Sequence, residues 1–180
     1  MIKFNVIGIS GHAGTGKDYF VNNVLRDEGY TVFSFAWHFK IWLVGKGFAT
    51  YEEVFHTKPP HIRKLLQEEG TERGRMLFGE AVWLNTAHAW MKCLSEFNGF
   101  TQYVFADVRF PNEVEFITNL GGRVYRMHAP NREAVSSLSP EARQHISETA
   151  LDTYNQFSGI IHNDLDVTIP QLVQQWEGRL

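Results

Sequence analysis

The sequence predicts a three-layer α/β fold, in which a parallel central sheet of about five strands carries helices on both faces. Short apolar segments alternate with amphipathic ones along the chain, and a glycine-rich turn follows the first apolar segment directly. The length of 180 residues, with 43% hydrophobic and 21% charged residues, is typical of one globular domain. We therefore expect a single domain over residues 1–180.

The expected strands are short and apolar, as in a parallel sheet that is covered on both faces. They are predicted at residues 2–9, 31–35, 102–106, 123–128 and 160–161. The run from Ile2 to Ile9 ends in the glycine-rich turn, which is typical of a buried strand.

Helices are expected where apolar residues recur every three or four positions. They are predicted at residues 17–26, 36–46, from 59 to about 70, 78–97, 111–120 and 170–176. Trp42 and Trp90 should face the core from two of these helices, and Cys93 is interpreted as a small core residue. A single cysteine excludes an internal disulfide and a multi-cysteine metal site.

The charge and hydropathy of the chain limit the classes of partner. A formal net charge of −3 creates no basic field for a nucleic acid polymer, so an anionic partner has to be bound locally. No run of eighteen apolar residues and no secretory signal is present, so we expect a cytoplasmic protein without a membrane partner. The oligomeric state, monomer or homodimer, stays open.

The strongest functional signal is the sequence Gly-His-Ala-Gly-Thr-Gly-Lys at residues 11–17, which fits the G-x-x-x-x-G-K pattern of a P-loop. Glycines let backbone N–H groups turn toward a phosphate, and the following helix directs its positive end at the same anion. The residues predicted to bind the phosphates of ATP are Gly11, Ala13, Gly14, Thr15, Gly16 and Lys17. Among these, Lys17 should reach the β- and γ-phosphates.

Asp18 stands where the P-loop pattern usually has Ser or Thr as a magnesium ligand. A carboxylate can hold Mg²⁺ directly or through water, and we favour this role. The alternative is structural, with Asp18 stabilising the positive end of the helix.

Asp107 and Arg109 follow an apolar segment, which places them at the carboxyl end of a central strand, where open parallel sheets bind ligands. Asp107 can hold the metal or accept a hydrogen bond from the substrate oxygen, and Arg109 can bind a phosphate with two hydrogen bonds. A solvated ion pair at the strand end is the alternative.

Arg63 and Gln67 are four residues apart on a predicted helix, so they share one face. Such a pair can hold an acceptor phosphate and the edge of a base. From spacing alone, a solvated helix face is the better interpretation of this pair and of Lys40.

The polar segment 130–148 is a candidate lid, because phosphoryl transfer needs cationic donors and the exclusion of water. It carries Arg132 and Arg143, with Arg126 at its start, and each of them is otherwise a surface charge. In the stretch His145–Glu148 a metal pair lacks an evident third ligand, so we reject a zinc site.

Taken together, these residues resemble the deoxynucleoside monophosphate kinases of tailed bacteriophages, and the likeness covers most of the chain. Its most specific element is the aspartate after the P-loop lysine. The likeness is carried by Gly16-Lys17-Asp18, Phe35-Ala36…Lys40, Arg63…Gln67…Gly70-Thr71-Glu72, Asp107-Val108-Arg109…Glu113, His145-Ile146-Ser147-Glu148 and Asn163-Asp164.

The resemblance implies an adenylate-kinase-like P-loop NTPase fold, with an NMP-binding region at about 36–75 and a lid at about 130–148. The residues that it assigns to the acceptor are Lys40, Arg63, Gln67, Thr71 and Glu72. It places Asp107 and Arg109 beside the reacting phosphates, and Asn163 and Asp164 near the base of the donor nucleotide. The sequence departs from the family pattern at Ala129, which replaces an expected lid arginine. This leaves Arg126, Arg132 or Arg143 to supply the positive charge of the lid. Our candidate among these is Arg132.

The expected function is transfer of the ATP γ-phosphate to a dNMP for nucleotide supply to DNA synthesis, with Mg²⁺ as the metal. The protein would then act in the host cell cytoplasm if it is phage-encoded. The animal phosphomevalonate kinases are similar around the P-loop and the Asp-x-Arg step, so they are the second hypothesis. The third is a non-enzymatic NTP-binding switch, which needs no acceptor pocket.

Overall fold

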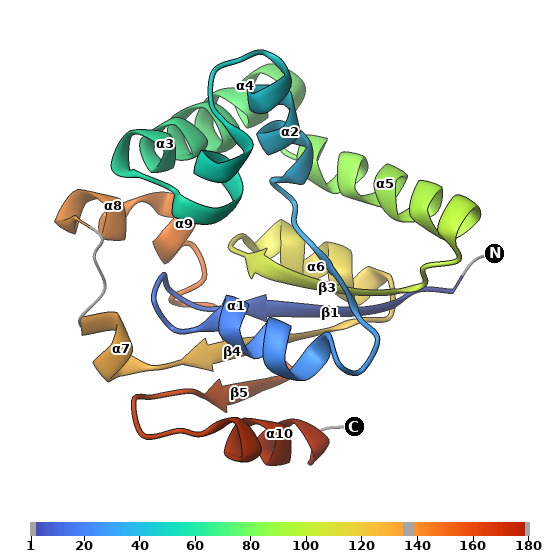
Figure 1. The fold of residues 1–180 in the computed structure, drawn as a ribbon, viewed down its shortest axis with the longest axis vertical. Helices are drawn as coiled ribbons and strands as arrows, with labels where there is room; N and C mark the ends of the chain where they lie inside the picture. Colours follow the sequence, from blue (N-terminus) through green and yellow to red (C-terminus); the bar gives the residue numbers. More distant parts are fainter. Residues whose placement is uncertain (1–2, 135–138, 179–180) are drawn as a thin grey trace.

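The computed structural model describes residues 3–134 and 139–178, except for the side chains at positions 71, 72, 133 and 134. At its centre is a five-stranded sheet with the strand order β2-β3-β1-β4-β5 (Figure 1). The strands are β1 (Asn5–Ser10), β2 (Thr31–Phe33), β3 (Gln102–Val108), β4 (Arg123–His128) and β5 (Gly159–His162). All neighbouring strands are parallel, which confirms the predicted α/β fold.

Helices connect these strands and cover both faces of the sheet. The first half of the chain contains α1 (Lys17–Phe20), the π-helical η1 (Val21–Leu25), α2 (Trp37–Gly45), η2 (Glu53–Thr57), α3 (Pro60–Leu65), η3 (Leu66–Arg73) and α4 (Gly74–Phe78). The second half contains α5 (Val82–Asn98), α6 (Pro111–Asn119), α7 (Pro130–Ala134), α8 (Pro140–Gln144), α9 (Ile146–Thr149) and α10 (Ile169–Glu177).

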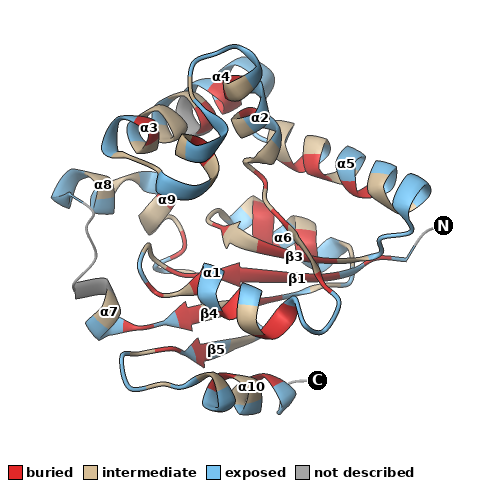
Figure 2. Ribbon diagram, in the orientation of Figure 1, coloured by how far each residue is buried: buried red, intermediate tan, exposed pale blue. Residues whose placement is uncertain are grey.

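Each face of the sheet has its own apolar core. On one face, Leu25 of η1 and Trp176 of α10 pack in one cluster with Ile9 of β1. On the other face, Met91 of α5 and Ile117 of α6 pack in a second cluster with β1 and β3 side chains. Figure 2 shows the buried residues concentrated along the strands between these two layers. The strands are apolar on both sides for this reason.

A third apolar cluster holds a helical unit that stands apart from the two sheet faces. Phe39 and Leu43 of α2 pack there with Val54 of η2 and Ile62 of α3. Figure 1 shows these helices on the β3 side of the sheet, close to α9. This unit forms the wall that faces the glycine-rich turn.

Three predictions of burial were wrong. Trp42 and Trp90 are 45% and 43% exposed, and Cys93 is also exposed. In α5 the buried stripe runs through Met91, and Cys93 follows two residues later, about 200° around the helix. Its side chain therefore points away from the core.

Some element boundaries also differ from the prediction. The strand at 123–128 agrees with β4, whereas α5 begins at Val82 rather than at residue 78. Gly79 has a φ of 90° and ends α4, so the predicted long helix is divided at this point.

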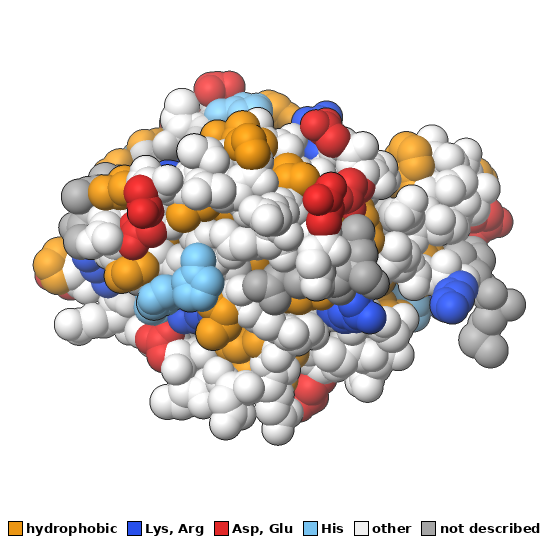
Figure 3. Space-filling model, turned by 90° about the horizontal axis from the view of Figure 1, so that it is seen from below, with side chains coloured by type: hydrophobic (Ala, Val, Ile, Leu, Met, Phe, Trp, Pro, Cys, Tyr) orange, Lys and Arg blue, Asp and Glu red, His pale blue; other side chains and the backbone are white. Residues whose placement is uncertain are grey.

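Of the helices in the described ranges, none combines the length and the apolar character that crossing a membrane requires. Figure 3 views the molecule from below, on the side where Figure 1 places β5 and α10. On this face, cationic and anionic side chains lie in separate small groups, with hydrophobic side chains between them.

Candidate active site

The glycine-rich turn forms a loop between β1, the central strand, and α1. Gly11 and Gly16 have φ angles of 142° and 84°, a region that favours glycine. A Cβ atom at Gly11 would lie 2.7 Å from the carbonyl oxygen of Met127, and one at Gly16 would lie 2.3 Å from Nδ2 of Asn163. The loop therefore follows a backbone path that larger residues would block. This path fits the phosphates of a nucleotide.

Lys17 is buried and folds back over this loop. Its Nζ donates hydrogen bonds to the carbonyl oxygens of Gly11 at 2.6 Å and His12 at 2.7 Å. Burial and then the nearby Arg109 guanidinium lower the pKa of Lys17 to about 7. An added anion beside Nζ would raise this pKa again, so the loop is electrostatically suited to a phosphate.

Glu148, to which the sequence analysis gave no role at this site, lies at the loop. Its Oε2 accepts a hydrogen bond from the Ala13 N–H at 2.9 Å, and its Oε1 forms an ion pair with Arg109. The side chain is only 7% exposed. His145 serves as the cap of α9, because its Nδ1 accepts from the Ser147 N–H at 3.2 Å. Glu148 therefore supplies negative charge to the loop.

Asp107 and Arg109 come from the carboxyl end of β3, beside β1. The Ser34 hydroxyl donates to Oδ2 of Asp107 at 2.5 Å, and the Phe35 N–H donates to Oδ1 at 3.3 Å. Arg109 donates to the carbonyl oxygen of Ser147 at 2.9 Å. Asp107 bonds to Ser34, and Arg109 pairs with Glu148. Within the described part of the chain, the alternative of an ion pair between Asp107 and Arg109 is therefore not observed.

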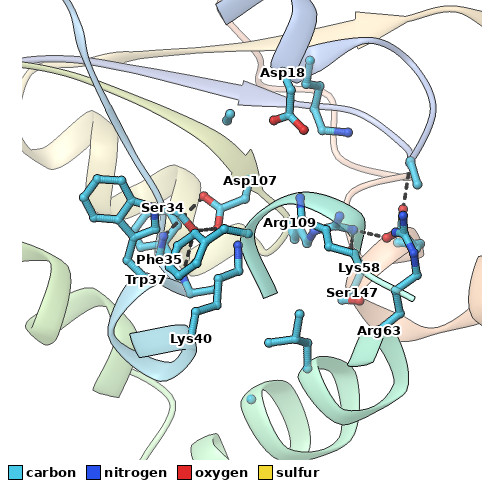
Figure 4. Close-up of a pocket in the computed structure, with 18 of the residues that line it drawn as sticks. Asp18, Ser34, Phe35, Trp37, Lys40, Lys58, Arg63, Asp107, Arg109 and Ser147 are labelled. Carbon is cyan, nitrogen blue, oxygen red and sulfur yellow. Dashed lines mark hydrogen bonds and ion pairs between the residues drawn. The ribbon is translucent and has the colours of Figure 1, made fainter. Parts of the chain in front are cut away.

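These residues line one pocket of about 1030 Å³, between the loop and the helical unit (Figure 4). Its cationic residues are Lys17, Lys40, Lys58, Arg63, Arg75, Arg109 and Arg132. Its acidic residues are Asp18, Asp107, Glu113 and Glu148. Formal positive charge is thus in excess here, whereas the chain as a whole has a net charge of −3. The pocket concentrates positive charge locally.

Arg75 illustrates the cations of the pocket that are neutralised by protein groups. It forms ion pairs with Glu113 at 2.9 Å and Glu80 at 3.3 Å, and its guanidinium lies 3.9 Å from the ring centroid of Phe110. Besides Lys17, whose Nζ bonds to loop carbonyl oxygens, four cations have no ion pair within the described part of the chain. They are Lys40, Lys58, Arg63 and Arg132. These four remain to balance the charge of a ligand.

Several predicted acceptor residues meet on the same side of the pocket. Arg63 from α3 and Gln67 from η3 both line it, and so does Lys40 from α2. Figure 4 shows the amine of Lys40 directed toward the Asp107 carboxylate. Asp18 lines the pocket from the loop side and is exposed. The other two predicted acceptor side chains, those of Thr71 and Glu72, lie outside the described residues.

Asn163 and Asp164 were expected near the donor base, and the structure gives them other contacts. Asn163 is fully buried beneath the loop, where its Nδ2 donates to the Thr15 carbonyl oxygen at 2.8 Å. Asp164 accepts a hydrogen bond from Nδ2 of Asn131 at 2.9 Å, and thereby contacts the start of the candidate lid. Neither residue is among those that line the pocket.

The arginines around the candidate lid have different surroundings. Arg132 of α7 lines the pocket, whereas Arg126 forms an ion pair with Asp152 at 2.9 Å and Arg143 is exposed away from the pocket. Ala129 is completely buried, so the position before Pro130 faces the core. Residues 135–138 of the lid lie outside the described ranges.

No protein-family model and no curated protein matches this sequence. Solved structures do match over nearly the whole chain. The protein TT1252 from Thermus thermophilus has a TM-score of 0.59 at 18% identity, over 97% of this chain and 95% of that one. A sugar kinase from Janibacter has a TM-score of 0.55 at 13% identity, over 97% and 93%. A shikimate kinase from Bacteroides thetaiotaomicron has a TM-score of 0.54 at 16% identity, over 97% of both chains. The chain thus has the fold that P-loop kinases share.

Proposed function

We propose that the protein is an ATP-dependent kinase that transfers the γ-phosphate to a deoxynucleoside monophosphate, which gives a dNDP and ADP. The observation that carries the proposal is the pocket, in which four cations form no ion pair with any described residue, beside a glycine loop with a buried lysine. The backbone path of the loop suits one polyphosphate. The cations on the opposite wall of the pocket can then bind a second anion. Transfer between two phosphorylated molecules requires two such sites in one pocket.

The lining of the pocket favours an acceptor with a planar base. The aromatic side chains of Trp37, Phe39 and Phe55 line it together with the amide of Gln67. An aromatic ring offers a base a stacking surface, and an amide offers both a donor and an acceptor for its edge. Phosphomevalonate has no ring to stack, so these residues support the nucleotide in preference to it.

In this proposal Lys17 moves from the loop carbonyl oxygens to the β- and γ-phosphates. Arg109 and Arg132 stabilise the charge that spreads over the transferred group. Asp107 would hold the metal, because the ionised phosphate of the acceptor has no proton to donate to a carboxylate. Residues 130–148 close over the phosphates and exclude water, which would otherwise compete with the acceptor.

Mg²⁺ fits the residues that are present. Among the described residues no three His, Cys, Asp or Glu side chains form a metal-binding group. Magnesium in nucleotide enzymes is usually held by one or two carboxylates together with phosphate oxygens and water, so a full protein cage is not needed. Asp18 and Asp107 would hold it here, where it neutralises phosphate charge.

A coupled ADP-release assay tests the proposal with the four dNMPs, the four ribonucleoside monophosphates and phosphomevalonate as acceptors. We expect ADP release with at least one dNMP. Release with phosphomevalonate alone would favour the second hypothesis. ATP binding without release for any monophosphate would instead favour an NTP-binding switch.

A further inference from the structure

Lys58 has a backbone conformation that a lysine rarely adopts. Its φ and ψ are 45° and 61°, and among the described residues it is the one non-glycine with a positive φ. The residue follows η2 and directly precedes Pro59, and the left-handed conformation brings the Cβ of an L-residue too close to the following carbonyl oxygen. Glycine or asparagine is the usual residue at such a helix end. Lysine therefore destabilises the turn relative to glycine or asparagine. A function of the lysine side chain would account for its presence here.

The turn brings this side chain to the acceptor side of the pocket. Lys58 lines the pocket and is only partly exposed, and its backbone N–H donates to the Glu53 carbonyl oxygen at 2.9 Å. After Lys58 the chain enters α3 through two prolines, and Arg63 of that helix lines the same pocket. The left-handed turn thus allows both cations to face one space.

Lys58 is also close enough to Lys40 to affect it electrostatically. Burial is the main cause that lowers the pKa of Lys40, and the charge of Lys58 lowers it further, while Asp107 opposes the shift. In the described part of the chain neither lysine has a carboxylate within ion-pair distance. Two ammonium groups that line one pocket in this way repel each other. A bound anion would remove the repulsion.

We propose that Lys58, together with Lys40 and Arg63, binds the phosphate monoester of the acceptor. A phosphate monoester carries about two negative charges at neutral pH, which matches two ammonium groups and leaves its oxygens to accept hydrogen bonds from Arg63. The inference rests on the proposed function, since an acceptor site is needed only where a second anion binds. It also accounts for the unfavourable turn, because a glycine there would relieve the backbone but bind nothing.

The variant Lys58→Gly separates the backbone strain of the turn from anion binding by the lysine side chain. It should raise the melting temperature by about 2–4 °C, because glycine adopts the left-handed conformation without strain. It should also raise the KM for the dNMP by about tenfold or more, while the KM for ATP stays within about twofold. A protein that becomes more stable and binds its acceptor less well has lost a ligand contact, not its fold. Lys58→Asn, which also tolerates this conformation, should behave in the same way.

Lys64→Ala is the matched control, because Lys64 is 73% exposed on α3 and pairs with Glu68 at 3.6 Å. It removes one positive charge close to the site and should change neither KM. An acceptor KM within about twofold of wild type in Lys58→Gly would overturn the proposal. A lower melting temperature of both Lys58 variants would do so too, because the turn would then not be strained.

A second measurement does not depend on turnover. With a non-hydrolysable ATP analogue bound at the loop, inorganic phosphate is titrated and the melting temperature is followed. Phosphate should stabilise the wild type and Lys64→Ala, and it should have little effect on Lys58→Gly. An equal response of all three proteins would contradict the site. If no monophosphate is phosphorylated but the difference persists, the proposed function fails and the anion site at Lys58 stands.

Discussion

Asn163 lies beneath the glycine loop, and its position predicts what the substitution Asn163→Ala does. The side chain is fully buried, and its Nδ2 donates to the Thr15 carbonyl oxygen at 2.8 Å. Its Oδ1 is buried without a hydrogen-bond partner in the described part of the chain. Alanine at this position removes one hydrogen bond of the loop and one unsatisfied oxygen together.

The two changes have opposite signs, and the first is larger. A buried carbonyl oxygen that loses its partner costs about 1–3 kcal/mol, and Thr15 is completely buried. Removal of the unsatisfied Oδ1 offsets part of this cost. We expect a net loss of about 1.5 kcal/mol in the free energy of unfolding. For a domain of this size that corresponds to a fall of about 3–6 °C in the melting temperature.

Thermal denaturation followed by circular dichroism measures this change in melting temperature. Titration with ATP and with GTP measures how tightly the loop binds each nucleotide. ATP and GTP should both bind less well to Asn163→Ala, by a similar factor, because the loop itself is less well supported. Asp164→Ala is the control, since its contact is with Asn131 and not with the loop. A changed preference between ATP and GTP at an unchanged melting temperature would refute this reasoning. It would show that Asn163 contacts the base, as the family resemblance implies.

Four further predictions concern the pocket. Lys17→Ala should lower turnover by about 10²–10³-fold in a folded protein, and near-normal turnover would contradict its role at the phosphates. Asp18→Asn should raise the Mg²⁺ concentration for half-maximal rate, whereas a lower melting temperature with an unchanged Mg²⁺ titration would favour the helix-capping role. Arg63→Ala should raise the KM for the dNMP and leave the KM for ATP unchanged, with Lys64→Ala as the control. Equal effects on the two KM values would place Arg63 outside the acceptor site. Burial raises the pKa of Glu113 from 4.5 to about 7, so the folded state holds this proton more tightly than the unfolded state. The free energy of unfolding should therefore fall as pH rises through this range, and Glu113→Gln should reduce that slope in denaturant titrations; an unchanged slope would contradict the shift.

Local sequence was sufficient for the features that depend on neighbouring residues. The strand at 123–128, the path of the glycine loop and the place of Asp107 at the end of β3 all follow from short apolar runs and adjacent turn residues. The same local rules misplaced Trp42. They place an apolar residue of a helix in the core, whereas the Trp42 ring stacks on Phe39 and stays 45% exposed.

Features that depend on distant contacts or on one backbone angle could not be predicted. Glu148 contacts the N–H of Ala13, which is 135 residues earlier, and no spacing in the sequence connects them. Asn163 contacts Thr15 at a similar separation. Lys58 was missed for a different reason, because a lysine before a proline gives no indication of a positive φ.

The strand order also has a consequence for synthesis of the chain. β1 is the first strand to be made, and its neighbours in the sheet are β3 and β4, with Asn5 opposite Gln102. A ribosome that adds about 5–20 residues per second needs about 5–20 s to make the intervening segment. During this time β1 has no strand partner on either edge, and its apolar side chains are unprotected. A nascent chain that stops before β3 would expose the apolar side chains and both edges of β1 permanently. Such a fragment should therefore aggregate.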